Sequence, residues 1–513
     1  MKFTLSKTDY ILYRDCAKNT WVKIYKPEIY NAKELSQFEK TIIETGNEID
    51  ELARKLFPGG ELVKGRGDTE YTKSLVDKKT AVIYQPFFQT EKYKMACDIL
   101  VWNNKAKRYD LFEVKASNSG EDKGAKDIIY AHDLAFQYIV LNSLKVPINK
   151  TYIIRLNKEY KRVGELDIQE LFTKEDFTEK VEKIKEEVTA EMENAYEVLS
   201  TDKEPFGECK CILRGRSAHC TTFTYSNPNV PEYSVHNITR IGLSKRKLEY
   251  LVDNDILDIM DVPEDTEGVF ELSEAQRNQV RVAQSGKQII KHDGVESFLS
   301  VIKYPISFID YETFASGIPR FFGYGPFDQI PFQFSLHILE KEDIDLNHNE
   351  FLFVDNTNPD VHFIKAMQKY IPAGGSIVVW NKKFEMGINK KLAERNPEYK
   401  KYLDNINSRV VDLEDPFKDQ HLVHPKFKGR TSIKYILPAL VPDLSYKNMD
   451  IQEGGTASDT WNKIVTGEYS KTEKEKKINH LKKYCELDTY AMYAIWKKLK
   501  EFTTTPKNID ATL

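Results

Sequence analysis

The pattern of hydrophobic and polar positions along the chain predicts strands and helices in two separate regions. In residues 94–117, KMACDILVWNNKAKRYDLFEVKAS, apolar and polar residues alternate on both sides of a polar turn, which is typical of two paired strands. In residues 306–314, ISFIDYETF, a mostly apolar strand carries two acids. In residues 479–499, NHLKKYCELDTYAMYAIWKKL, apolar residues recur at helical spacing. The chain therefore reads as an α/β protein with more than one domain.

Breaks in this pattern place the domain boundaries. Residues 1–200 read as mixed α/β and end with a long charged helix from about Lys174 to Leu199. A short cysteine-containing segment, a Pro/Asn-rich stretch and several short helices follow. We therefore expect a first domain over residues 1–222, a helical linker over 223–300 and a second domain over 301–505, with a loose tail from residue 503.

Composition limits the class of protein. The 513 residues are 41% hydrophobic and 12% aromatic, which argues against general disorder. The net charge is -4, from 75 basic and 79 acidic residues, so any basic path for nucleic acid must be local. The sequence lacks an apolar run of membrane-helix length and a signal-peptide core at its N-terminus, so we expect a soluble cytoplasmic protein without a membrane partner.

The predicted strand pair in residues 94–117 carries the first chemical constellation. Period-two alternation places Glu113 and Lys115 on one strand face, and Asp98 on the preceding strand can face the same pocket. Two carboxylates that hold Mg²⁺ or Mn²⁺ and a lysine that orients water suit phosphodiester hydrolysis. The alternative is a solvated hairpin face with a salt bridge.

Two further segments connect this constellation to a known superfamily. Gly46 to Asp50 open an amphipathic helix, IDELARKLF, and Gln137 lies on a helix after the strand pair. Together with flanking cysteines, these features resemble the RecB/AddB-type PD-(D/E)xK nucleases, including the iron–sulfur nucleases of CRISPR adaptation. The resemblance implies a restriction-endonuclease-like fold for residues 1–222, Asp50 as a further metal ligand where the family commonly has His, and Gln137 as a DNA contact. Glu48 and Glu51 are alternative candidates for this metal ligand, and Leu141 lies at the position where the family motif has tyrosine.

Four of the six cysteines form a candidate cofactor site. Cys209, Cys211 and Cys220 fall within one short segment, and Cys16 lies far upstream. In the iron–sulfur branch of the superfamily, one N-terminal cysteine and three after the nuclease core hold a [4Fe–4S] cluster. The same thiolates also suit Zn²⁺, and the third possibility is a group of buried thiols without a ligand. Cys97 and Cys485 read as packed thiols.

The strand at residues 306–314 begins the second constellation. Asp310 and Glu312 share one strand face, about 6–7 Å apart at the usual strand rise. Two buried carboxylates this close repel each other unless a cation lies between them, which favours a divalent metal. Glu385 falls in the first turn of a helix that Asn381 is expected to cap, and Asp488 lies one turn after Tyr484. Asp488 interrupts an apolar helical stripe of Leu481, Tyr484, Cys485, Ala491, Met492, Ile495 and Leu499.

This set resembles the DnaQ-like DEDD exonucleases. Asp310 and Glu312 match the first motif, Asn381 and Glu385 the second with Glu in place of Asp, and Tyr484 and Asp488 the third in its tyrosine form. The resemblance implies a ribonuclease H-like domain at residues 301–505, two-metal 3′ to 5′ removal of nucleotides and water positioning by Tyr484. Asp412 resembles an additional acid of the family. The alternative is a chance set of acids on core elements.

Three basic residues, and a resemblance that spans nearly the whole chain, add to the expected function. Lys428, Arg430 and Lys434 either bind phosphate or form a solvated face. The order of domains and the segments IPFQFSLHI and GRTSIKYILPAL resemble an uncharacterised bacterial family, of the domain of unknown function 2779 type, that fuses the two nucleases. The resemblance implies a dual nuclease that processes DNA ends in repair, recombination, phage defence or CRISPR spacer trimming. The alternatives are an exoribonuclease whose first domain only binds nucleic acid, and a binding scaffold.

Overall fold

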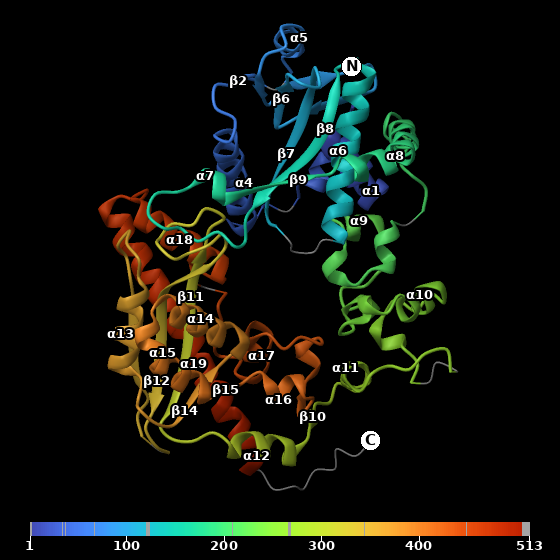
Figure 1. Cartoon of the computed structure of the whole chain (residues 1–513). Coiled ribbons are helices and arrows are strands. Elements are labelled where there is room, and N and C mark those ends of the chain that lie inside the picture. The colour runs from blue at the N-terminus through green and yellow to red at the C-terminus, as the bar shows by residue number, and fades with distance from the viewer. Residues whose placement is uncertain are drawn as a thin grey trace. The chain divides into compact units, whose positions relative to one another are not determined.

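A computed structural model describes residues 3–32, 34–35, 37–65, 67–119, 124–207, 209–264, 268–342, 344–447 and 449–504. The chain forms two compact units, coloured mainly blue to green and green to red in Figure 1. Unit 1 comprises Met1–Ile212, His219–Pro228 and Ser316–Asp328, and unit 2 comprises Leu213–Ala218, Asn229–Ala315 and Gln329–Leu513. The loose tail expected at the C-terminus lies outside the described residues from residue 505 onward.

Unit 1 contains a mixed six-stranded sheet of order β2-β3-β6-β7-β8-β9. The expected strand pair forms as the antiparallel hairpin β6/β7, and α6 crosses over to β8, which is parallel to β7. A second sheet has the order β1-β5-β4. The strands are β1 Leu5–Ser6, β2 Glu61–Leu62, β3 Val82–Tyr84, β4 Phe87–Gln89, β5 Tyr93–Ala96, β6 Ile99–Asn103, β7 Arg108–Asn118, β8 Ile148–Leu156 and β9 Phe172–Asp176.

Helices cover this sheet and supply its core. On α8, Val181, Val188, Met192, Ala195 and Leu199 recur at helical spacing, are buried, and belong to one apolar core with the α6 residues Leu134, Phe136 and Val140. The helices of unit 1 are α1 Lys7–Asp15, α2 Ala17–Tyr25, α3 Pro27–Tyr30, α4 Gln37–Arg54, α5 Thr69–Asp77, α6 Ala125–Ser143, α7 Ile168–Leu171, α8 Thr178–Leu199 and α9 Phe223–Ser226.

Three local expectations for unit 1 were wrong in detail. Helix α4 begins at Gln37 rather than at Gly46, because an interior glycine costs a helix only about 1 kcal/mol and does not end it. Helix α8 begins at Thr178 rather than Lys174, because Phe172–Asp176 pair with β8 as an edge strand. Asp98 lies at a bend immediately before β6 rather than within a strand.

Unit 2 is built on a five-stranded sheet of order β13-β12-β11-β14-β15, with helices on both faces (Figure 1). Ile309 and Tyr311 of β11 pack with α13, α14 and α15 in one core, whereas the alternate residue Phe308 contacts Tyr493 and Trp496 of α19. Asp310 and Glu312 share the face of Phe308 by strand alternation. The strands are β11 Ile306–Ala315, β12 Gln329–Leu339, β13 Asn347–Leu352, β14 Ser376–Val379 and β15 Val410–Asp412.

The remaining elements of unit 2 are short, apart from α19. The expected helical linker, residues 223–300, has its own small core, which includes Val235, Leu248 and Ile259. Its first residues, up to Pro228, belong to unit 1, and the rest groups with unit 2. A two-stranded ladder joins β10 Ile289–Ile290 to β16 Leu422–Val423. The helices are α10 Lys245–Asp253, α11 Glu274–Ser285, α12 His292–Ser300, α13 Asp360–Tyr370, α14 Lys382–Arg395, α15 Lys400–Ser408, α16 Asp415–Lys418, α17 Ile433–Leu440, α18 Gly454–Thr466 and α19 Lys471–Thr504.

Short 3₁₀ turns connect several of these elements. They are Lys210–Leu213, Arg216–Ala218, Val235–Asn237, Ile241–Leu243, Ile259–Asp261, Pro397–Tyr399 and Pro425–Phe427. In the described part of the chain, none of the helices combines the length and the apolar character that crossing a bilayer requires.

Candidate metal centres

The hairpin β6/β7 brings the expected acids of unit 1 together. Glu113 is 3% exposed, and the Asp98 carboxylate accepts a 2.7 Å hydrogen bond from the backbone N–H of Val114. Burial and the negative charge of Glu113 raise the pKa of Asp98 to about 8. Lys115 donates to Glu113 at 2.7 Å, so Asp98, Glu113 and Lys115 form one cluster in which Glu113 is buried and the other two are partly exposed.

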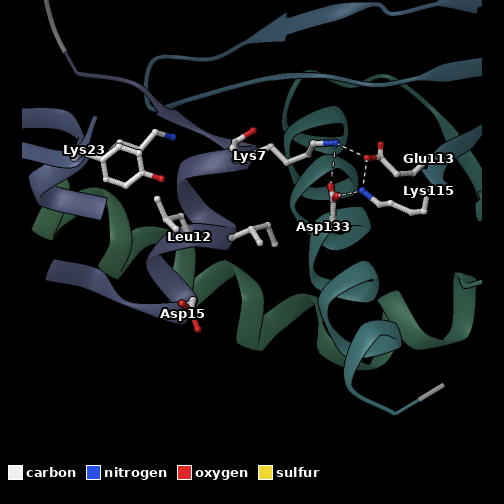
Figure 2. A pocket seen from close by; sticks show the side chains of 10 residues that line it. Lys7, Leu12, Asp15, Lys23, Glu113, Lys115 and Asp133 are labelled. Atoms are coloured by element: carbon white, nitrogen blue, oxygen red, sulfur yellow. Dashed lines mark hydrogen bonds and ion pairs between the residues drawn. The ribbon is translucent and has the colours of Figure 1, made fainter. Parts of the chain in front are cut away.

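Two residues that the sequence did not single out complete this cluster. Lys7 at the start of α1 donates to Glu113 at 2.7 Å and lies 3.1 Å from Asp133, as Figure 2 shows. Lys115 makes a 2.6 Å ion pair with Asp133. Burial alone would lower the pKa of Lys7, but Asp133 and Glu113 raise it well above its ordinary value. Asp133 has a sequence signal, since it lies one turn before Gln137 on α6, whereas Lys7 has none.

Gln137 supports the cluster from inside the unit. Its side-chain amide donates to Glu113 at 2.8 Å and to Asp133 at 3.0 Å, and the residue is fully buried. The exposed DNA contact expected of Gln137 is therefore not available in this conformation, because burial encloses its side chain. Leu141, one turn further, is also buried.

A fourth acid approaches the cluster from α4. Asp50 forms an ion pair with Arg54 and accepts a 2.9 Å hydrogen bond from Gln85, and its charge contributes to the raised pKa of Asp98. Its other carboxylate oxygen is buried without a hydrogen bond from any described residue. Glu48 and Glu51 are exposed, so the structure favours Asp50 among the three competing acids.

A pocket of about 530 Å³ opens onto this cluster. Lys7, Glu113, Lys115 and Asp133 line one end, and Leu12, Asp15 and Lys23 line the other, as Figure 2 shows. Acids and lysines that converge on a pocket of this kind can hold a divalent cation and a phosphate together.

In unit 2, four acids from three elements converge. Asp310 and Glu312 come from β11, Glu385 from the first turn of α14 and Asp488 from α19. Burial, together with Asp488 and Glu312, raises the pKa of Asp310 well above its ordinary value. Burial also raises the pKa of Glu385 to about 8 and that of Asp488 to about 6. One Glu385 oxygen is buried without a hydrogen bond from any described residue.

Two tyrosine hydroxyls form hydrogen bonds with the Asp488 carboxylate. Tyr446, which the sequence did not single out, donates to Asp488 at 2.6 Å, and Tyr484 lies one turn before it on α19. Hydrogen bonds from both hydroxyls lower the pKa of Asp488 against the effect of burial. Nothing local marks Tyr446, because its contact with α19 spans distant parts of the chain.

The start of α14 is fixed by Asp412 rather than by the Asn381 side chain. Asn381 adopts a left-handed conformation with φ 73°, and its side chain makes no capping hydrogen bond. Asp412 accepts hydrogen bonds from the backbone N–H of Asn381 at 2.9 Å, of Lys382 at 3.1 Å and of Glu414 at 3.1 Å. Asn381 therefore occupies the expected N-cap position without capping the helix through its side chain, and Asp412 orients the helix that carries Glu385. The exposed Asn381 side chain stays available to a ligand.

Of the three basic residues expected near this site, only Lys434 acts on the acids. Its positive charge lowers the pKa values of Glu312 and Asp488, and its ammonium group donates to the Gln452 carbonyl at 2.7 Å. Lys428 instead pairs with Glu232 at 3.0 Å. Arg430 stacks 4.2 Å from the centre of the Tyr435 ring.

Cys16, Cys209, Cys211 and Cys220 gather in unit 1, and their sulfur atoms all lie within 4.8 Å of one another. Three are buried and Cys220 is partly exposed. The Asn227 amide donates to the Cys209 sulfur at 3.2 Å, and the Asn19 backbone N–H donates to the Cys16 sulfur at 3.5 Å. Four close thiols with N–H donors can bind a metal. Cys97 and Cys485 are buried away from this group.

Comparisons with known proteins agree with the expected family only at a coarse level. Residues 307–432 match a domain of unknown function, DUF2779. Over 206 residues the chain is 30% identical to uncharacterized protein MG366 of Mycoplasma genitalium, covering 37% of the chain and 31% of that protein. Over 307 residues it is 25% identical to uncharacterized protein UU173 of Ureaplasma parvum, covering 56% of the chain and 42% of that protein.

A homolog of MG366 in Mycoplasma pneumoniae is 27% identical over 224 residues, covering 38% of the chain and 32% of that protein. The chain thus spans less than half the length of each of these relatives. No solved structure matches. The matched domain contains Asp310, Glu312, Glu385 and Asp412 but ends before Tyr446 and Asp488. Over these parts of its length the chain is thus similar to a domain of unknown function and to uncharacterized bacterial proteins.

Proposed function

We propose that the chain is a divalent-metal-dependent nuclease whose principal hydrolytic site is the acid cluster of unit 2. The observation that carries the proposal is the convergence of Asp310, Glu312, Glu385 and Asp488, which are buried or nearly so and have raised pKa values. Four such carboxylates cost free energy through desolvation and mutual repulsion, and they suit Mg²⁺ or Mn²⁺, which prefer oxygen ligands.

The residues of this cluster have distinct tasks in the proposed reaction. The four acids would hold two ions, which supply Lewis-acid stabilisation of the attacking and leaving oxygens and lower the pKa of water. Tyr446 fixes one oxygen of Asp488 through its 2.6 Å hydrogen bond. Tyr484 lies beside the same acid and would orient the attacking water. Asp412 holds the first turn of α14 and so the position of Glu385.

The substrate class follows from the same residues. A phosphodiester needs two-metal charge neutralisation more than a neutral ester does, because its transition state spreads negative charge over oxygens. The resemblance to DEDD exonucleases favours 3′ to 5′ removal of nucleotides from DNA ends. Lys434, whose charge acts on Glu312 and Asp488, is a basic residue for the substrate backbone. Exposed Asn381 and Phe384 lie at the start of α14. RNA is the alternative substrate.

The cluster of unit 1 is proposed as a second nuclease site of the PD-(D/E)xK kind. Asp50, Asp98 and Glu113 would hold the ion, and Lys115 would orient water. The contacts of Lys7 and Lys115 with Glu113 and Asp133 support this assignment, since the same carboxylates that neutralise two lysines can receive a divalent cation in exchange. A binding module without hydrolytic activity is the alternative for unit 1.

The thiol group is proposed to hold a [4Fe–4S] cluster, with Zn²⁺ as the alternative. Four thiols suit both, and hydrogen bonds from N–H groups to two of the sulfurs support a thiolate site. Cys16 precedes α2, whereas the other three ligands follow α8, so the group would join the beginning and the end of unit 1.

The test is degradation of end-labelled single- and double-stranded DNA and RNA with Mg²⁺ or Mn²⁺. Asp310→Asn and Asp488→Asn keep side-chain shape and should each slow 3′-end trimming by about 1000-fold or more, because a metal ligand is lost. Asp404→Asn, which changes an exposed ion pair on α15, should trim at the wild-type rate. Cleavage that persists in Asp310→Asn should disappear when Glu113→Gln is added.

Several outcomes would contradict these assignments. If Asp310→Asn and Asp488→Asn trim at the wild-type rate, the acid cluster of unit 2 is not the exonuclease site. If Glu113→Gln changes no cleavage in either background, unit 1 is a binding module. If the wild-type protein degrades none of the nucleic acids, the chain is not a nuclease and a binding scaffold is the better description.

A further inference from the structure

A pair of histidines lies under α19 on the sheet of unit 2, beside the acid cluster but separate from it. His337 on β12 and His348 on β13 are direct cross-strand neighbours, with ring centres 4.5 Å apart and 29° between the ring planes. Glu486 on α19 lies 3.8 Å from Nδ1 of His348. One ligand atom from each of the three residues lies within 4.8 Å of the other two.

A hydrogen-bond chain connects one nitrogen of each imidazole through two hydroxyl groups. Nδ1 of His337 contacts the Thr489 hydroxyl at 2.8 Å, which contacts the Ser335 hydroxyl at 2.7 Å. The Ser335 hydroxyl in turn contacts Nε2 of His348 at 3.0 Å. These hydrogen bonds occupy one nitrogen of each ring and leave Nε2 of His337 and Nδ1 of His348 for another ligand. Histidines that bind metals typically have this arrangement, with the second nitrogen in a hydrogen bond.

The protons of this chain can be arranged so that both free nitrogens carry a lone pair. The Thr489 hydroxyl also lies 3.1 Å from the backbone carbonyl of Glu486 and can donate to it. Thr489 then accepts from His337 and from Ser335, and Ser335 accepts from His348. In this arrangement each of the four protons has an acceptor, and the ring protons are directed away from Glu486.

An ordinary ion pair explains this group less well. A His348–Glu486 ion pair requires a protonated imidazole, and that charge would lie against the ring of His337, which is only 4% exposed. Two imidazoles in their neutral form next to a carboxylate make up a ligand set that zinc commonly uses.

We propose that His337, His348 and Glu486 bind one divalent transition-metal ion of the zinc type, with a coordination position left for water. Two imidazole nitrogens select such an ion over Mg²⁺, which prefers oxygen. The Glu486 side chain is half exposed, so the site is open to solution.

The position of the group indicates what the ion does. Glu486 lies two residues before Asp488 on α19, and Ser335 lies opposite Asp310 in the β11/β12 ladder. A bound ion would link α19 to β12 and β13 and so fix the helix that carries Asp488. The inference concerns metal binding and does not depend on the proposed nuclease activity.

The test is zinc binding to the full-length protein, measured by competition with a chromophoric chelator in saturating Mg²⁺. His348→Gln and Glu486→Gln should each bind one zinc ion fewer per chain than the wild type. The matched control His362→Gln changes an exposed histidine on α13 and should bind as the wild type does. Thr489→Val removes only the hydroxyl and should weaken this zinc by about tenfold, as expected for a residue that orients a ligand.

All variants keep the four cysteines, so zinc held there does not change the difference between them. His348 and Glu486 are partly exposed, and unchanged circular dichroism would show that the variants fold. Asp310→Asn should retain the extra zinc ion, which separates this site from the acid cluster. If His348→Gln and Glu486→Gln bind as many zinc ions as the wild type with equal affinity, or if Asp310→Asn alone loses the ion, the proposal is wrong.

Discussion

Glu113 and Glu385 are both buried carboxylates, but they differ in what compensates their charge. Glu113 contacts the ammonium groups of Lys7 and Lys115, each at 2.7 Å. In the described part of the chain, no ion pair of 4.0 Å or less reaches Glu385 or the three acids around it. Lysines therefore compensate the charge of Glu113 without a metal, although burial still raises the pKa of its neighbour Asp98. Among the described residues the clustered acids of unit 2 have no such partner, and their raised pKa values favour the protonated forms until a cation binds.

This difference predicts a pH dependence for metal-free unit 2. The folded-state pKa values of Glu385, about 8, and Asp488, about 6, lie above the value of about 4 expected in the unfolded chain. The folded state then binds more protons than the unfolded state, so the free energy of unfolding falls as pH rises from about 4 to about 8. Thermal unfolding in EDTA should show a lower Tm for unit 2 at pH 8 than at pH 6.

A variant and a metal ion serve as controls for this pH dependence. Glu385→Gln removes one of the titrating groups and should reduce the pH dependence, and saturating Mg²⁺ should do the same because it compensates the ionised acids. A Tm of unit 2 that rises between pH 6 and pH 8 in EDTA would contradict the charge state inferred for this cluster.

At the scale of elements, local periodicity predicted the main strands and helices, whereas several contacts between distant parts of the chain were missed. Strand β11, helix α14 and helix α19 were all expected, because alternation and helical spacing are properties of neighbouring residues. Lys7 and Tyr446 were missed, since nothing near them in the sequence marks the acids that they contact. The first residue of α4 was misplaced because a glycine was given more weight than the helical pattern that precedes it.

Helix α4 gives a prediction at this scale. Gly46 lies in its interior, and a Cβ atom added there would meet nothing within 4 Å. Gly46→Ala should therefore raise the free energy of unfolding of unit 1 by about 0.5–1 kcal/mol, measured by urea denaturation. Gly375→Ala is the contrasting control, because its φ is 78° and its Cβ would lie 1.9 Å from the Pro305 carbonyl oxygen, so unit 2 should lose stability. A loss of stability in Gly46→Ala would contradict the position of this residue inside α4.

At the scale of the whole molecule, the chain has two units whose cores and candidate cofactors are separate. The expected boundary at residue 222 falls inside His219–Pro228, which belongs to unit 1 and includes Cys220. Segment Ser316–Asp328 belongs to unit 1 although the residues on both sides of it in the sequence belong to unit 2, and no local pattern predicts this. The proximity of Cys16 to Cys209, Cys211 and Cys220 was the part of this organisation that the sequence predicted.

The four thiols therefore predict a difference in stability between the two units. A ligand on Cys16, Cys209, Cys211 and Cys220 would close a loop of nearly the whole of unit 1, so its loss raises the entropy of the unfolded state of unit 1 and leaves unit 2 unaffected. Protein purified without oxygen should be brown, and Cys16→Ser should lose the colour and lower the Tm of unit 1 only. Cys97→Ser, at a buried thiol outside the group, should keep the colour. Colourless protein with about one zinc ion per chain would shift the assignment to zinc. Colourless protein without metal, together with an unchanged Tm in Cys16→Ser, would contradict a ligand at this site.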